Sequence, residues 1–141
     1  FEDARTANRL ENLITLCPRC HMRAENVVRI RSGLSGVAYA LSHLAPLLLM
    51  CDRFDLGLHT DPRSPLGENN PTIVLYEEIP AGVGFSKRLY DLHDILIQQA
   101  FQLVTACPCL SGCPSCVGPG GESGSGGKTE ARAILKLLLP A

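Results

Sequence analysis

Tryptophan is absent from this chain of 141 residues, and aromatic residues together make up only 5% of it. Any hydrophobic core must therefore consist mainly of Leu, Ile, Val and Ala side chains. Charge of one sign is also lacking, since the formal net charge is -1. No strongly basic composition therefore indicates a nucleic-acid-binding protein. The length fits one domain, because typical domains have about 100–150 residues.

A long uninterrupted hydrophobic run is missing as well. The most apolar stretch, residues 34–50, is interrupted by Ser35, Gly36, Ser42, His43 and Pro46. A membrane-spanning helix needs about 20 predominantly apolar residues, so this stretch is marginal in length and too interrupted. The chain does not begin with a signal-peptide pattern or with Met. We therefore expect a soluble, cytoplasmic domain without a membrane segment, cut from a longer polypeptide.

Arginine is unevenly distributed, with six arginines before the first long apolar stretch. They are Arg5, Arg9, Arg19, Arg23, Arg29 and Arg31. Acidic residues are interspersed among them, which is more typical of a solvated surface than of a phosphate-binding track. A nucleic-acid contact is therefore expected only as part of a larger protein.

Hydrophobic periodicity predicts an α+β fold that is rich in helix and has a few short strands. The expected helices cover residues 34–45, 85–106 and 129–139, and Pro46 should kink or restart the first of them. The expected strands cover residues 27–31 and 72–79. The interval 52–71 contains three prolines and several turn-forming residues, which indicates a loop.

Four of the seven cysteines are concentrated in one short segment, CPCLSGCPSC. They are Cys107, Cys109, Cys113 and Cys116, and they follow the expected long helix and precede the C-terminal helix. Zinc in structural sites takes four soft ligands in a tetrahedron, which a tight loop can supply. Because all four positions would be protein ligands, no position is left for a reactive water. The spacing therefore predicts a structural zinc ion rather than a catalytic one.

Other fates of these cysteines are less favoured by the sequence. Disulfides are typical of small secreted proteins, whereas nothing here indicates secretion and the number of cysteines is odd. An iron–sulfur cluster is a closer alternative, because four cysteines can also hold one.

These residues resemble a known family. The runs GLSGVAYALSHLAPLLLMCDRFDLG, LYEEIPAGVGFSKRLYDLH and CPCLSGCPSCVGP are similar to the MrfA-like zinc-binding domain. That domain lies at the C-terminal end of superfamily 2 DEAD/DEAH-box helicases implicated in DNA repair. The resemblance covers about residues 27–141 and implies that the four clustered cysteines bind zinc. The chain departs from the family pattern at residues 77–78 and 81–82, where the family often has an Asp and a Gly-Gly.

The N-terminal segment carries a second, incomplete cysteine motif. Residues 8–25, NRLENLITLCPRCHMRAE, resemble the second half of an HNH-type zinc element, with Asn12 and His21 at matching positions. Cys17 and Cys20 would supply two metal ligands, but neither Cys nor His precedes them in the chain. Two cysteines cannot complete a four-coordinate zinc site. We therefore divide the chain into an HNH-like remnant, residues 1–26, and a zinc-binding domain, residues 27–141.

Two glycine-containing segments resemble phosphate-binding motifs only in part. The run GGESGSGGKT ends like a Walker A loop, but Glu122 stands where the first glycine belongs and no strand precedes the run. Gly82 and Gly84 lie between an expected strand and an expected helix, where amides can bind an anion. A tight strand-to-helix turn explains these two glycines equally well.

The sequence thus favours a non-catalytic, zinc-stabilised accessory domain of an ATP-dependent DNA helicase. Its expected partners are the ATP-binding motor domains of the same polypeptide and, through them, DNA. A fragment of an HNH-type endonuclease and a free-standing zinc-bound interaction module are the alternatives.

Overall fold

The computed structural model describes residues 17–80, 82–118 and 127–140. The regular elements, in chain order, are α2 (Pro18–Leu49), β1 (Leu56–Ser64), β2 (Asn70–Glu77), α3 (Phe85–Asp91), α4 (His93–Ala106) and α5 (Gly127–Leu138). Two 3-10 turns, Arg53–Asp55 and Pro65–Gly67, flank β1. The predicted α+β class, rich in helix, is confirmed.

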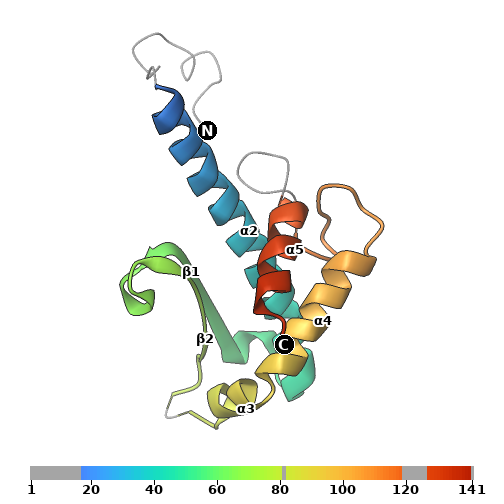
Figure 1. Cartoon of the computed structure of the whole chain (residues 1–141). Helices are drawn as coiled ribbons and strands as arrows, with labels where there is room; N and C mark the ends of the chain where they lie inside the picture. The colour runs from blue at the N-terminus through green and yellow to red at the C-terminus, as the bar shows by residue number, and fades with distance from the viewer. Residues whose placement is uncertain (1–16, 81, 119–126, 141) are drawn as a thin grey trace, which may run out of the picture.

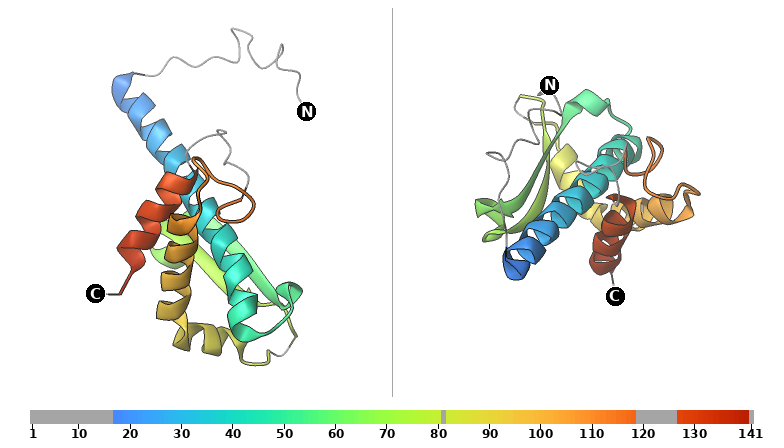
Figure 2. Two further views of the ribbon diagram at one scale, coloured as in Figure 1. Left: turned by 90° about the vertical axis from the view of Figure 1, so that its right-hand side faces the viewer. Right: turned by 90° about the horizontal axis from the view of Figure 1, so that it is seen from above.

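Helix α2 is the central element, and the other elements pack on two of its sides (Figure 1). Helices α4 and α5 lie on one side, and the β1–β2 hairpin lies on the other, as the view from above shows (Figure 2). The N-terminal part of α2 extends beyond this assembly, and residues 17–26 are exposed wherever their burial is described. The C-terminal part of α2 therefore contributes its side chains to the core.

The structure corrects two expectations for α2. Residues 27–31 are helical rather than a strand, because the face that carries Gly33 and Gly36 packs against α5, and this context outweighs weak β-propensity. The helix also continues through Pro46. Ala45 and Leu49 on either side of it are buried, and their packing offsets the hydrogen bond that proline cannot donate.

Because α2 is continuous, it meets the length and composition of a membrane span, contrary to the expectation from residues 34–50. The core helix of a water-soluble protein can have the same length and composition. In this fold 61% of the apolar window is buried inside the protein. Most of this apolar stretch thus packs against other parts of the chain.

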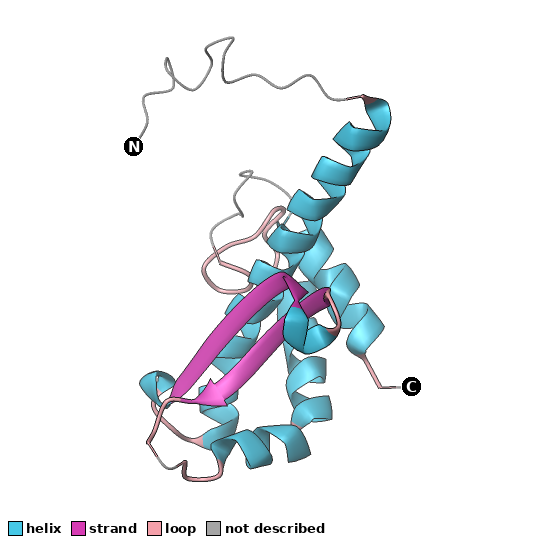
Figure 3. Cartoon of the chain, turned by 90° about the vertical axis from the view of Figure 1, so that its left-hand side faces the viewer, coloured by secondary structure: helices cyan, strands magenta, loops and turns pink. Residues whose placement is uncertain are grey.

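The hairpin occupies a segment that the sequence indicated to be mainly loop. Strand β1 pairs antiparallel with β2, from Leu56 opposite Glu77 to Ser64 opposite Asn70 (Figure 3). The ladder is irregular between Asp61 and Ser64, where Pro62 has no amide hydrogen to donate. Strand β2 confirms the prediction for residues 72–79 in outline, and β1 replaces the loop expected in residues 52–71.

The helix expected over residues 85–106 is two helices. Leu92, with φ -98° and ψ 7°, separates α3 from α4. Within α4, Leu96 and Ile97 are buried, whereas Ile95 is 46% exposed. Helix α5 confirms the predicted C-terminal helix to within a few residues.

The core forms where these helices meet the cysteine loop. Its buried residues are Val37, Ala40, Leu41, Ala45 and Leu49 of α2, Leu89 of α3, Leu96, Ile97, Ala100 and Val104 of α4, Ala131 and Leu135 of α5, and Cys116 and Val117 of the loop. Cys116 is only 1% exposed. The loop is thus part of the core rather than an appendage.

Candidate metal centre

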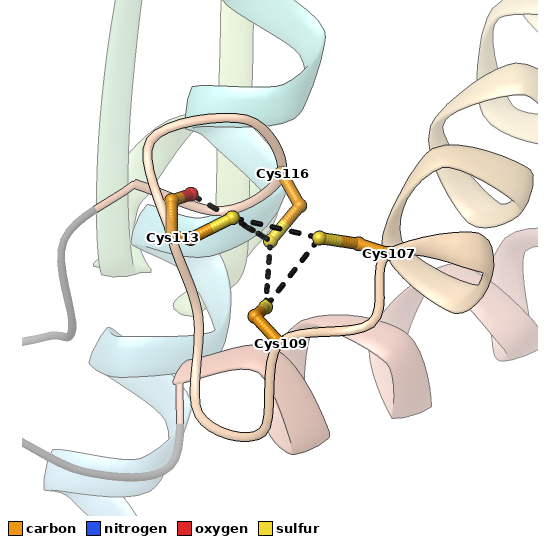
Figure 4. A group of neighbouring side chains, drawn as sticks. All are labelled: Cys107, Cys109, Cys113 and Cys116. Atoms are coloured by element: carbon orange, nitrogen blue, oxygen red, sulfur yellow. Dashed lines mark hydrogen bonds between the residues drawn. The ribbon is translucent and has the colours of Figure 1, made fainter.

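The four clustered cysteines bring their sulfur atoms together at the end of α4 (Figure 4). Neighbouring sulfur atoms are 3.5 Å apart for Cys107–Cys109, Cys107–Cys113 and Cys109–Cys116, and 3.6 Å apart for Cys113–Cys116. All four lie within 4.8 Å of one another. All four cysteines are free. The disulfide alternative therefore does not describe this cluster.

This spacing fits a tetrahedral metal ion. Zinc–sulfur bonds of about 2.3 Å place the sulfur atoms of a regular tetrahedron about 3.8 Å apart. The observed separations of 3.5 and 3.6 Å require only a small expansion of the cluster. Among the described residues, no other group of three or more Cys, His, Asp or Glu is arranged to hold a metal ion.

The backbone of the loop explains how ten residues can enclose one point. Cys107 caps α4, and its amide donates to the carbonyl of Leu103. Gly112 has a φ of 128°, a conformation that a residue with a side chain rarely adopts. The amides of Cys116 and Gly118 then both donate to the carbonyl of Cys113. These two turns direct the second cysteine pair back toward the first.

The thiols of the cluster differ in acidity before any metal binds. At Cys109, burial opposes ionisation, but hydrogen bonds from the thiols of Cys116, Cys107 and Cys113 outweigh it and lower the pKa to about 7. Burial, as the largest cause, raises the pKa of Cys116 to about 12. One thiolate thus forms readily, and the remaining protons must be displaced when a metal ion binds.

Two side chains from distant parts of the chain hold this loop. The hydroxyl of Tyr39, on α2, donates to the carbonyl of Pro114 at 2.8 Å. The Tyr39 ring also packs so closely against Gly118 that a Cβ there would lie 2.9 Å from it. From α5, Lys128 Nζ donates to the carbonyls of Cys107 and Cys109, both at 2.6 Å. Three helices therefore meet at the cysteine cluster.

The sequence did not identify Tyr39 or Lys128 as residues of the site. Tyr39 lies 75 residues from its partner along the chain, and nothing in its local pattern indicates the contact. Lys128 belongs to the GKT run that resembled the end of a Walker A loop. Glu122, which argued against that motif, lies outside the described residues, whereas Lys128 itself contacts the cysteine loop.

The N-terminal cysteine pair is separate from the cluster. Cys17 and Cys20 are exposed, and the structure does not include them in the four-sulfur group. The Cys17 sulfur accepts a hydrogen bond from the amide of Cys20 at 3.4 Å, and this bond lowers the pKa of the Cys17 thiol. Asn12 lies outside the described residues, so the HNH-like pattern stays a prediction.

The turn around Gly82 and Gly84 binds a carboxylate of the chain itself. Glu77 accepts hydrogen bonds from the amides of Ser86 at 2.6 Å, Val83 at 2.7 Å and Gly84 at 3.4 Å. These bonds, that of Ser86 first, lower the pKa of the Glu77 carboxyl. The amides that an external anion would need are therefore already engaged, which favours the tight-turn interpretation.

Similarity to known proteins agrees with this geometry. The family model of the MrfA Zn-binding domain matches residues 37–117. The ATP-dependent helicase YprA of Bacillus subtilis (strain 168) is 37% identical over 105 residues, which are 74% of this chain and 13% of YprA. A crystal structure of the DUF1998 helicase MrfA bound to DNA has a TM-score of 0.68 and 31% identity, over 78% of this chain and 14% of that one. A second, bound to DNA and AMPPNP, has a TM-score of 0.64 and 31% identity, over 75% and 14%.

The matched residues include part of α2, all of α4 and the cysteine loop up to Val117, and therefore all four clustered cysteines. The chain spans only a small part of the proteins it is similar to, at 13% of YprA and 14% of MrfA. The match and the sulfur geometry together identify the kind of domain. The chain belongs to the MrfA Zn-binding domain family.

Proposed function

We propose that Cys107, Cys109, Cys113 and Cys116 bind one structural zinc ion, and that the chain is an accessory domain of an ATP-dependent DNA helicase. The observation that carries this proposal is the four-sulfur cluster at the junction of α2, α4 and α5. With four thiolate ligands, zinc has no open coordination position for a substrate or a water. The metal's role is therefore to hold the three helices together.

The energy available from such an ion is large compared with the stability of a domain. Structural zinc contributes an apparent ~10–16 kcal/mol in small zinc-finger peptides. A whole domain is stable by only about 5–15 kcal/mol. The cluster joins the end of α4 to the start of α5, and the connecting residues 119–126 are rich in Gly and Ser. A connection of this composition does not fix the position of α5 relative to α4, and zinc supplies that constraint.

The helicase assignment rests on the family and on what the related proteins are. YprA is an ATP-dependent helicase, and MrfA has been crystallised bound to DNA. We infer that the parent polypeptide is a superfamily 2 DEAD/DEAH-box helicase of the cytoplasm that acts in DNA repair. In it, residues 27–141 would brace the ATP-binding motor domains and help to shape the path of the DNA strand. The chain itself would be non-catalytic and would not enter a membrane.

We also propose that residues 1–26 are an HNH-like remnant. Helix α2 crosses from that segment into residues 27–141 without a break. Cys17 and Cys20 would need two further ligands from another part of the parent polypeptide to bind a second metal ion. A nuclease role has less support, because an HNH nuclease needs a general-base His before its cysteine pair, and residues 1–16 contain no His.

The first experiment measures the metal content of the purified chain by elemental mass spectrometry, together with its absorption spectrum. We expect one zinc per chain and no visible absorption band. Cys113→Ser should lose the metal, whereas Cys51→Ser, a change to a half-buried cysteine outside the cluster, should retain it. Iron with a visible band, or full zinc content in the Cys113→Ser chain, would refute the site.

The second experiment tests the helicase role in the full-length parent polypeptide. We expect ATP-dependent separation of duplex DNA that weakens with Cys113→Ser and not with Cys51→Ser, while the isolated chain hydrolyses no ATP. An RNA duplex run in parallel identifies the preferred nucleic acid. Metal-dependent cleavage of DNA without strand separation would instead support the endonuclease alternative.

A further inference from the structure

Lys128 stands at a position where a cation is unfavourable in the absence of a specific partner. It is the second residue of α5, and the N-terminus of a helix carries partial positive charge from its unpaired amides. Lysine is accordingly favoured in the last turn of a helix, not the first. Its location therefore calls for a compensating interaction, and the cysteine loop provides one.

The interaction is bidentate and short. The Lys128 ammonium lies 2.6 Å from the carbonyl oxygens of both Cys107 and Cys109, and the side chain is half-buried. Hydrogen bonds from a charged donor are shorter and about twice as strong as neutral ones. Burial strengthens them further because water screens the charge less. The ammonium thus fixes the backbone of two of the four cysteines.

The start of α5 is itself held rigidly, so the ammonium is in place in advance. Ala131 and Leu135 are fully buried. A Cβ added to Gly36 of α2 would lie 3.0 Å from the Cβ of Ala131 and 3.2 Å from the carbonyl of Gly127. With so little space between α2 and α5, the first turn of α5 cannot move away from the cysteine loop without disturbing the core.

The positive charge of the Lys128 ammonium can offset the excess negative charge of a zinc–thiolate cluster. Four thiolates outweigh the two positive charges of one zinc ion, so the cluster carries excess negative charge. Within the described part of the chain, Lys128 is the basic residue whose side chain donates hydrogen bonds to the loop. Residues outside the direct ligands commonly orient them and tune metal affinity, and their loss typically costs about 10–100-fold in affinity.

We propose that Lys128 is a positioning residue of the zinc site, which holds the carbonyls of Cys107 and Cys109 and offsets the negative charge of the thiolates. This inference rests on the proposed zinc site. It assigns to the lysine of the Walker-like run a role within the domain, in place of nucleotide binding. It also makes the docking of α5 and the retention of zinc depend on each other.

The test is zinc affinity, measured by competition with a chromophoric chelator. Lys128→Met removes the charge and keeps the length of the side chain, and we expect it to weaken zinc binding by about 10–100-fold. Lys136→Met makes the same change at an exposed position of the same helix and should bind zinc within about twofold of wild type, because surface charges contribute little. Lys128→Arg keeps the charge and should fall between wild type and Lys128→Met.

Tyr39→Phe distinguishes the effect of the Lys128 charge from the effect of losing any hydrogen bond to the cysteine loop. It removes the neutral hydrogen bond to Pro114 and should weaken zinc binding less than Lys128→Met, by under about tenfold. Cobalt substitution provides a spectroscopic check, since all variants should keep the absorption of a four-thiolate tetrahedral site. That spectrum would show that the Lys128→Met chain is folded around the metal and has lost affinity alone.

Several results would overturn the inference. Wild-type affinity of the zinc-loaded Lys128→Met chain would refute it while leaving the zinc site intact. Equal losses in Lys128→Met and Tyr39→Phe, or in Lys128→Met and Lys128→Arg, would show that the charge has no special part. Equal losses in Lys128→Met and Lys136→Met would reduce the effect to net charge. A wild-type chain without zinc would refute the proposed site, and this inference with it.

Discussion

Gly33 offers a test in which two well-known effects oppose each other. In the interior of an isolated helix, replacing Gly by Ala stabilises by about 1 kcal/mol. In this fold the new Cβ would lie 2.7 Å from Ile134 Cδ1 and 2.9 Å from the Cβ of Glu130, whereas carbon atoms pack best at about 3.5–4.0 Å. The end of the Ile134 side chain can rotate away. The Glu130 Cβ can move only with α5.

The expected outcome of Gly33→Ala is therefore a net loss of stability. Overpacking of this kind costs about 1–3 kcal/mol, which exceeds the gain of about 1 kcal/mol in helix propensity. We expect a net destabilisation of about 1 kcal/mol, or about 4 °C in Tm for a domain of this size. Displacement of α5 should also strain the salt bridge from Arg29 Nε to Glu130 Oε1, now 3.1 Å long.

Thermal unfolding of the zinc-loaded chain, followed by circular dichroism, measures this effect. Ser35→Ala is the matched control, because Ser35 is an exposed residue of the same helix and should gain a few tenths of a kcal/mol from propensity alone. If Gly33→Ala raised Tm as Ser35→Ala does, the close approach of α2 and α5 would be refuted. The argument for a rigidly held Lys128, which uses the neighbouring approach of Gly36 to Ala131 and Gly127, would then be weakened as well.

Three further outcomes follow from the packing and the charges. Leu135 is fully buried, so Leu135→Ala should lower the free energy of unfolding by about 2.7–5 kcal/mol, whereas Leu137→Ala, at a residue 84% exposed, should change it little in the same urea titration. Because the pKa of Glu77 is lowered, its ionised carboxylate stabilises the fold above the ordinary carboxyl value of 4.5, and this effect is lost as pH falls through the folded-state pKa. The Tm of Glu77→Gln should therefore lie below that of wild type at neutral pH and approach it below pH 4.5. The control Glu68→Gln, at an exposed residue, should have a Tm close to that of wild type throughout. Removal of zinc with a chelator should abolish cooperative unfolding in circular dichroism, and added zinc should restore it; an unchanged melting curve after zinc removal would contradict a structural role for the ion.

The cysteine cluster was predictable because its information is local. Four thiols within ten residues cannot lie far apart, and the turn at Gly112 needs only the backbone freedom that glycine provides. The helix-rich class followed from hydrophobic periodicity, which is also local. In each case the residues concerned are neighbours along the chain, so the pattern can be recognised without knowing the fold.

What the sequence did not reveal depends on partners that are remote along the chain. Strand β1 has the composition of a loop and becomes a strand only because β2 pairs with it. Residues 27–31 have β-branched side chains, yet they continue the helix whose next turns pack against α5. The contact between Tyr39 and Pro114 spans 75 residues, and no local pattern encodes such a pairing.

The same distinction explains why one ion can govern so much of this fold. The cysteine loop makes few backbone hydrogen bonds of its own, and those from the amides of Cys116 and Gly118 share a single carbonyl. Its shape must therefore be fixed by the sulfur cluster and by the contacts from Tyr39 and Lys128. Because Cys116 and Val117 belong to the buried core, a loop released from the metal would open that core to water. Zinc, loop and helix packing are thus one cooperative unit, and none of the three is expected to keep its structure without the other two.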